Sequence, residues 1–358
     1  MEQVLSGPWG NISVVPIVLD CPSAQHLNDL DLTPYRQWIF REENLDAIRQ
    51  HFVKADLSPA VCDQLLKTGT PLPGGKGFVF HPPDAIVRDL SPGPRASLYA
   101  VLSRLPANIG QNIPFCFRGS SLQEWFVGNS VPPATISLIE PLLYKRAGYL
   151  LFSDPQLVLP AIPERYKRLA VIRALRRMST LRMRVFLKPD ESPDSALAYW
   201  GQANRYTAVE PLLPALAMPP DGLSVTSLLP PFARSRLYTY PSEKEPGGAA
   251  HCNCHWTSLN FFNDPPDDAI ATDANIAKTL ATLYEPLTSS TRLGDIILFF
   301  DGNNLVHSCV YIAGDIVFTK NGAGTIAPYL LQHLQDVEAG YRLMYGSVKL
   351  GFCRRKGT

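Results

Sequence analysis

The hydrophobic residues of this chain are spaced most regularly in its last third. Trp256, Leu259 and Phe262 follow one another at steps of three, which is typical of one face of a helix. Asn253 precedes them and is a residue type that commonly caps helices. The pattern therefore predicts a helix that begins at Cys254.

Further along the chain, the pattern changes from helical spacing to short apolar runs. Residues 274–283 still predict a helix, whereas 296–300, 306–312 and 316–320 are apolar runs separated by turn residues. Tight turns between such runs are typical of antiparallel hairpins. We therefore expect an α+β domain over residues 236–358, in which a helix packs on an antiparallel sheet.

The first 235 residues predict a larger mixed α/β region, which can comprise two subdomains and whose fold the pattern does not specify. Ser58 precedes an amphipathic stretch and predicts a capped short helix. Prolines recur between Pro211 and Pro231, and a packed helix cannot run through that spacing. We place the domain boundary just after this stretch, near Ser235.

Composition and charge narrow the possible partners. The 358 residues carry a formal net charge of +1, which gives no overall attraction to nucleic acid or to an acidic membrane. The start of the chain shows no signal sequence, and no segment is apolar for long enough to cross a bilayer. The seven cysteines are irregularly spaced and indicate reduced thiols. We expect a cytoplasmic protein without a nucleic-acid or membrane partner.

Cys254 and His307 are the residues whose chemistry says most about a possible function. The free N–H groups at a helix start stabilise a thiolate, and a strand histidine brought against it can act as a base. This chemistry predicts a cysteine hydrolase that cleaves an amide or peptide bond through a Cys254 acyl-enzyme, without a metal or an organic cofactor. Cys252 is the rival nucleophile, and Cys254 is preferred because the helix follows it directly.

A third residue is expected to orient the imidazole of His307 from the neighbouring strand. Counting across the turn at residues 313–315 places Asn321 or Gly322 opposite His307, and we expect Asn321 to take this role. Thr319 is the alternative. The Tyr240 hydroxyl is expected to contact the oxyanion or the substrate, together with the backbone N–H of Cys254.

Four segments in the last third, taken in order, resemble the NlpC/P60 superfamily of papain-like cysteine peptidases and amidases. They are Tyr240, Asn253-Cys254, Gly294-Asp295-Ile296-Ile297, and the strand that begins at His307. The resemblance covers about Leu237 to Arg354 and implies a papain-like fold with a cysteine, histidine and polar-residue triad. In related thiol acyltransferases the histidine precedes the cysteine, so the order found here favours a hydrolase.

Two further interpretations stay open beside the hydrolase and the acyltransferase. The first is a zinc site, since several soft ligands cluster in the sequence, although most zinc ligand pairs are separated by two or more residues. The potential ligands are His251, Cys252, Cys254, His255, His307 and Cys309. The second is a papain-like module that has lost catalysis and serves only in binding.

Overall fold

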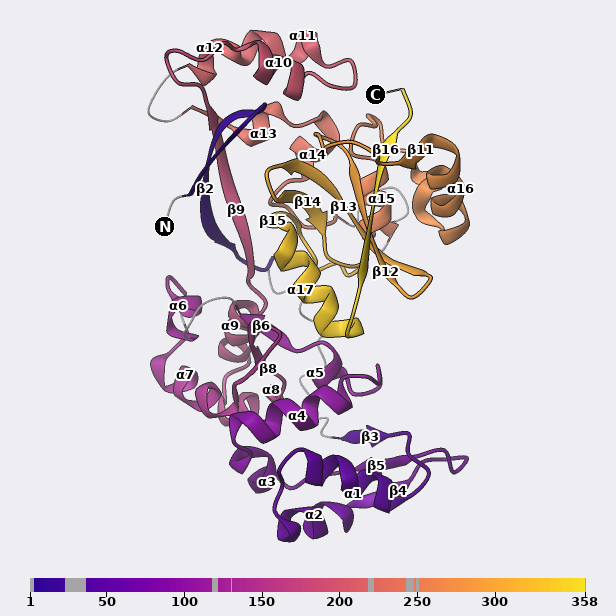
Figure 1. Cartoon of the computed structure of the whole chain (residues 1–358). Helices are drawn as coiled ribbons and strands as arrows, with labels where there is room; N and C mark the ends of the chain where they lie inside the picture. The colour runs from indigo at the N-terminus through magenta and orange to yellow at the C-terminus, as the bar shows by residue number, and fades with distance from the viewer. Residues whose placement is uncertain are drawn as a thin grey trace. The chain divides into compact units, whose positions relative to one another are not determined.

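The computed structural model describes residues 3–22, 37–117, 122–129, 131–217, 222–242, 248 and 251–357. The chain divides into two compact units that are interleaved in the sequence (Figure 1). Unit 1 consists of Met1–Pro22, Met178–Tyr341 and Ser347–Thr358, and unit 2 of Ser23–Arg177 and Arg342–Gly346. This division differs from the boundary expected near Ser235, which lies inside unit 1.

A four-stranded antiparallel sheet explains why the beginning of the chain belongs to unit 1. Strand β2 pairs with β9 along nine residues, from Asn11 opposite Phe186 to Leu19 opposite Met178. The sheet has the order β1-β2-β9-β10, with β1 at Gln3–Gly7, β2 at Gly10–Leu19, β9 at Met178–Phe186 and β10 at Leu223–Ser224. Pairing between distant segments, rather than a linker, therefore defines the unit.

A six-stranded antiparallel sheet forms the other half of unit 1, in the order β11-β16-β12-β13-β14-β15. Its strands are β11 (Tyr284–Pro286), β12 (Ile296–Asp301), β13 (Asn304–Ala313), β14 (Ile316–Lys320), β15 (Tyr329–His333) and β16 (Lys349–Arg355). The three strands predicted over 296–320 are confirmed, and β13 begins two residues earlier than predicted.

Helices lie on both faces of this sheet. Helix α15 (Cys254–Leu259) and helix α16 (Asp273–Leu283) share a core with Val310, Ile312 and Phe318. Helix α17 (Leu334–Tyr345) packs on the other face. The predicted helix starts are confirmed to within one residue, but α15 ends at Leu259, before Phe262.

The two sheets of unit 1 share one core, which also includes short helices from the middle of the chain. The buried Thr180 Oγ1 of β9 donates to Leu331 O of β15 at 2.9 Å and so joins the two sheets. The half-buried Tyr238, in the loop after α14 (Pro231–Arg236), donates from Oη to Leu181 O at 2.6 Å. The short helices are α10 (Asp194–Trp200), α11 (Tyr206–Val209), α12 (Leu213–Leu216), α13 (Val225–Leu228) and α14. Because these helices belong to the same core, unit 1 continues through the boundary expected near Ser235.

Unit 2 combines two small antiparallel sheets with nine described helices. One sheet has the order β3-β5-β4 (Trp38–Phe40, Phe78–Phe80, Gly69–Pro71), and the other β6-β8-β7 (Phe115–Phe117, Tyr149–Phe152, Tyr144–Arg146). The helices are α1 (Leu45–Lys54), α2 (Pro59–Leu66), α3 (Asp84–Asp89), α4 (Pro92–Leu102), α5 (Ile109–Asn112), α6 (Leu122–Phe126), α7 (Pro133–Ile139), α8 (Pro155–Val158) and α9 (Arg165–Leu175). Ser58 caps α2 through Val61 N, as predicted.

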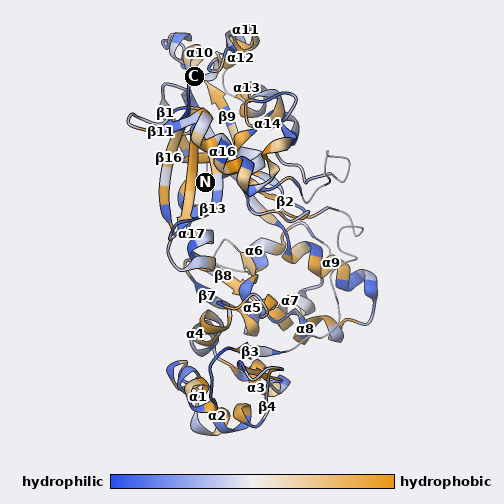
Figure 2. Cartoon of the chain, turned by 90° about the vertical axis from the view of Figure 1, so that its right-hand side faces the viewer, coloured by the Kyte–Doolittle hydropathy of each residue, from blue (hydrophilic) through white to orange (hydrophobic). Residues whose placement is uncertain are grey.

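The fold is therefore mixed α and β with antiparallel sheets, as the sequence predicts at this level. Hydrophobic and hydrophilic residues both occur along α9, whose buried side includes Leu169 and Ile172 (Figure 2). In the described part of the chain, no helix combines the length and the apolar character needed to span a bilayer.

Candidate thiol site

Cys254 occupies the first position of α15. The Asn253 side chain accepts a hydrogen bond from Trp256 N at 2.8 Å and so satisfies one free N–H of the helix start. The backbone N–H groups of Ser308, His255 and Cys254 itself each favour the thiolate form of Cys254. Burial acts in the opposite direction and is the largest effect, so the pKa of the thiol is raised.

The N–H of Ser308 reaches the thiol because of the way β13 and β14 pair. Their described pairing runs from the turn only as far as Val310 opposite Phe318. Ser308 and Lys320 lie beyond that point, on the face of the sheet that packs against α15. The middle of β13 and the end of β14 therefore bring a backbone donor and a cationic side chain to the start of one helix.

Lys320 is a fully buried lysine that acts electrostatically on this thiol. Its amine donates hydrogen bonds to Gly322 O at 2.8 Å and Gly324 O at 3.1 Å. Burial lowers the pKa of Lys320 to about 8, and the thiols of Cys252 and Cys254 partly oppose that shift. At neutral pH the amine is thus mostly protonated, and its charge favours the thiolate.

His307 lies on the other face of the sheet. Its ring stacks on Tyr341 of α17, with a centroid distance of 4.3 Å and an interplanar angle of 19°. Its Nε2 is 3.1 Å from Thr319 Oγ1, and its Nδ1 has no hydrogen-bond partner among the described residues. The structure thus places His307 against Tyr341 and Thr319, and it does not bring the ring against Cys254. The catalytic pairing of Cys254 with His307 stays a prediction.

Strand alternation determines which face His307 occupies, and a bulge lies directly before it. In the pairing of β12 with β13, Phe299 lies opposite His307 but Phe300 lies opposite Leu305, so Val306 is an extra residue. Leu305 packs with the core shared by α15, whereas Val306 and Cys309 pack with the core under α17. His307 alternates with Ser308 and so faces α17 together with Cys309, and the extra residue adds Val306 to the same face.

Thr319 is the residue that hydrogen-bonds to His307, and Asn321 lies one step further along the same network. Thr319 Oγ1 donates to Asn321 Oδ1 at 2.9 Å, and Asn321 Nδ2 donates to Gln332 Oε1 at 2.7 Å. The sequence predicts that Asn321 contacts the imidazole directly. In the structure Thr319 contacts the imidazole, and Asn321 contacts Thr319. The role of Asn321 in catalysis stays a prediction.

His255 and Ser308 form a second polar pair beside Cys254. His255 Nδ1 is 2.9 Å from Ser308 Oγ, and the ring of His255 also lines a pocket of about 850 Å³. Burial lowers the pKa of His255 to about 4, against a smaller raising effect of Asp273. Ser308 is not among the residues predicted from the sequence, and no positive role is predicted for Lys320. Strand alternation with Val310 and Phe318 is the signal that places both on the α15 face.

The remaining candidates lie apart from this arrangement or offer little chemistry. The Tyr240 hydroxyl is buried without a hydrogen-bond partner among the described residues, and its charged neighbours are Cys21 and Asp20. Its expected role at an oxyanion stays a prediction.

Cys252 is fully buried, and its sulfur lies 4.0 Å from Gly248 O. Among the described residues, no group of three or more His, Cys, Asp and Glu side chains is arranged to hold a metal ion.

One buried and one half-buried neutral histidine make the stability of unit 1 depend on pH. Burial lowers the pKa of His307 well below its ordinary value and that of His255 to about 4. A lowered pKa means that the unfolded chain binds more protons, so stability is present above pH 6.5 and is lost as the pH falls toward the folded pKa. We expect each histidine to contribute up to about 1.4 kcal/mol of loss per pH unit in this window.

Urea unfolding between pH 7.5 and 4.5 measures this loss. The variant His307→Met keeps an apolar side chain against Tyr341 and should lose less stability on acidification than the wild type. An unchanged pH dependence in this variant would show that folding does not lower the pKa of His307.

Searches of protein-family models, of curated protein sequences and of solved structures gave no match to this chain.

Proposed function

We propose that this protein is a cysteine hydrolase that cleaves an amide or peptide bond through an acyl-enzyme at Cys254. The observation that carries the proposal is the surroundings of the Cys254 sulfur, where three backbone N–H groups and the charge of Lys320 all favour a thiolate. These groups oppose burial, which is the largest effect and raises the pKa of the thiol, and they thereby increase the fraction present as a nucleophilic thiolate. A helix that carries the cysteine and packs on an antiparallel sheet also agrees with the papain-like arrangement implied by the resemblance.

The surroundings of Cys254 support Lys320, rather than His307, as the group that takes the thiol proton. A lysine whose pKa is lowered to about 8 has a substantial neutral fraction in mildly alkaline solution and can accept a proton there. The sulfur then attacks the carbonyl carbon of the substrate, and the negative charge moves to the carbonyl oxygen. Lys320 returns the proton to the departing amine, and water cleaves the resulting thioester to a carboxylic acid and free Cys254.

Mapping of an electrophilic probe tests the nucleophile. After brief treatment of the folded protein with iodoacetamide at pH 8, we expect modification at Cys254, since its thiolate is the one stabilised by several N–H groups. Peptide mass spectrometry distinguishes it from Cys252 and from Cys309, which is fully buried and whose pKa is raised well above its ordinary value. Modification of Cys252 with Cys254 intact would contradict the assignment.

Ser308 is a second candidate nucleophile, favoured by its hydrogen-bonding distance of 2.9 Å from His255. An uncharged imidazole that receives the serine proton would activate the hydroxyl for the same reaction. A fluorophosphonate probe reacts with activated serines and leaves an unactivated hydroxyl unmodified. Modification of Ser308 by this probe, with no reaction of Cys254 toward iodoacetamide, would replace the cysteine mechanism by a serine mechanism.

A further inference from the structure

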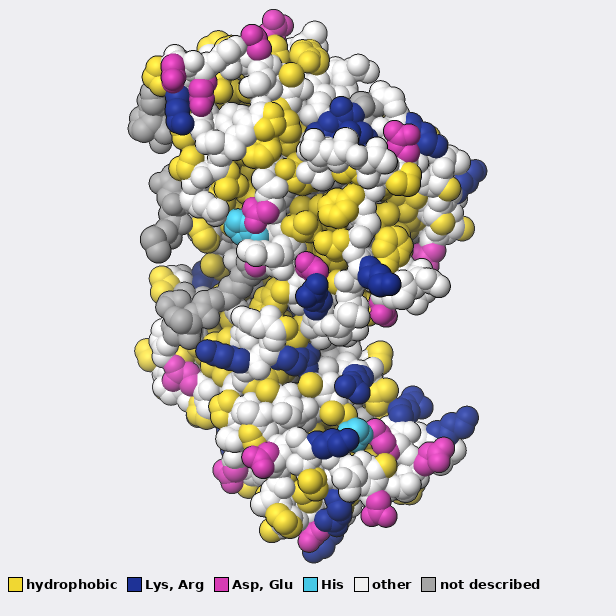
Figure 3. All heavy atoms as spheres, in the orientation of Figure 1, with side chains coloured by type: hydrophobic (Ala, Val, Ile, Leu, Met, Phe, Trp, Pro, Cys, Tyr) yellow, Lys and Arg dark blue, Asp and Glu magenta, His cyan; other side chains and the backbone are white. Residues whose placement is uncertain are grey.

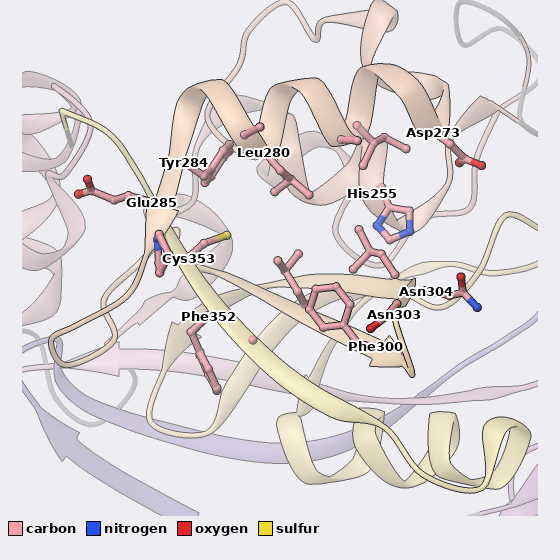
Figure 4. A pocket seen from close by; sticks show the side chains of 17 residues that line it. His255, Asp273, Leu280, Tyr284, Glu285, Phe300, Asn303, Asn304, Phe352 and Cys353 are labelled. Atoms are coloured by element: carbon pink, nitrogen blue, oxygen red, sulfur yellow. The ribbon is translucent and has the colours of Figure 1, made fainter.

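A pocket of about 850 Å³ lies in unit 1 between α16 and the strands β11, β12 and β16 (Figure 4). Its volume falls within the range of pockets that bind small molecules, about 300–1,000 Å³. His255 contributes to its wall, whereas neither Cys254 nor Ser308 lines it. The pocket is therefore a feature beside the thiol site and has a surface of its own.

The middle of the pocket is apolar. Ile276 and Leu280 reach it from α16, and Leu298 and Phe300 from β12. On the face shown in Figure 3, hydrophobic side chains gather over β12 and β16. Burial of an apolar group here would gain about 25 cal/mol for each Å² removed from water. The body of a ligand is thus expected to be hydrocarbon.

The charges of the pocket are all of one sign. Asp273 and Glu285 are its ionisable acids, and no lysine or arginine occurs among the described residues that line it. Asp273 is exposed at the rim of the pocket, at the same end as His255 and Asn304, while Glu285 points away from the opposite end (Figure 4). Because the pKa of His255 is lowered to about 4, its ring adds no positive charge at neutral pH. The end at Asp273 is therefore negative.

We propose that this pocket binds a small apolar molecule that carries a protonated amine, with the amine beside Asp273 and the hydrocarbon body between Leu280 and Phe300. An ammonium group donates strong charge-assisted hydrogen bonds to a carboxylate. A ligand carboxylate at the same position would face Asp273 without any cation to offset the repulsion. The inference stands on the pocket alone and does not depend on the chemistry of Cys254.

Three ligands of nearly equal shape test the charge preference: 4-phenylbutylamine, 4-phenylbutanol and 4-phenylbutyrate. Titration calorimetry with the full chain at pH 7 should show saturable binding of the amine. The butyrate should bind at least about tenfold more weakly than the amine, and the alcohol should lie between them. Equal or tighter binding of the butyrate, or no saturable binding of the amine, would overturn the proposal.

Two variants locate the site, each with a matched control. Asp273→Asn should remove the advantage of the amine over the alcohol, whereas Asp190→Asn, at an exposed turn outside the pocket, should retain it. Ala277→Trp places a large ring in the pocket and should abolish binding of the amine. Ala274→Trp changes an exposed position of the same helix that does not line the pocket and should leave binding intact. Binding unaffected by both pocket variants would place the amine elsewhere and refute the assignment.

Discussion

Replacement of Lys320 by methionine should slow the alkylation of Cys254 about 10- to 100-fold at pH 7. At this pH the amine of Lys320, whose pKa is about 8, is mostly protonated and lowers the pKa of the thiol. Loss of the charge leaves burial as the main effect and raises the thiol pKa further, so a smaller fraction is thiolate. The rate of iodoacetamide modification of the Cys254 peptide, followed from pH 6 to 10, measures the change.

The controls for this experiment separate Lys320 from His307. Lys278→Met removes an exposed lysine from α16 and should leave the rate unchanged. His307→Ala should have a smaller effect than Lys320→Met, because the imidazole lies on the α17 face against Tyr341. A rate that is unchanged in Lys320→Met but falls sharply in His307→Ala would restore His307 as the partner of the thiol.

Replacement of Arg95 by methionine should lower the free energy of unfolding of unit 2 by about 3–5 kcal/mol. The side chains of Arg95 and Asp154 are 0% and 1% exposed, and their Nη1 and Oδ2 atoms are 2.7 Å apart. Arg95 also donates hydrogen bonds to Val87 O and Leu90 O. Without the guanidinium, the carboxylate of Asp154 stays buried with its main cationic partner removed, and those carbonyls lose their donors.

Native-state hydrogen exchange, resolved by peptide, measures this loss in unit 2 within the full chain. Arg49→Met provides the matched control, since Arg49 and Asp63 form an ion pair at 2.7 Å with side chains 39% and 54% exposed. That change should cost less than about 1 kcal/mol. A cost for Arg95→Met no larger than for Arg49→Met would mean that the buried pair adds no net stability.

The local features of the last third followed from short stretches of sequence. The helix start at Cys254 depends on the Asn253 side chain and its neighbour Trp256 N, three residues away. The hairpin between β13 and β14 depends on a turn at Gly314, whose φ of 63° suits glycine. Such features depend only on interactions between residues close in the chain, so they can be predicted from short stretches of sequence.

The extent of unit 1 depends on contacts that no local pattern records. Strand β2 pairs with β9, and the pairs are separated in sequence by more than 150 residues. The predicted boundary near Ser235 relied on a proline-rich composition, yet Phe232 and Leu237 on either side of it are buried in the same core. Composition reports where helices cannot run, but it does not report which segments share a core.

The sequence by itself determined the cap at Asn253, the thiol at a helix start and the order of strands in the hairpins, because each depends on nearby residues. Only the tertiary structure decided which side chains meet the thiol. Alternation along β13 from Val310 places Ser308 on the α15 face and His307 on the α17 face. The same strand then presents Ser308 to α15, and β14 brings the buried Lys320 to Cys254. The side chains that meet Cys254 come from strands far from α15 in the sequence, so strand register and packing determine the partner of this thiol.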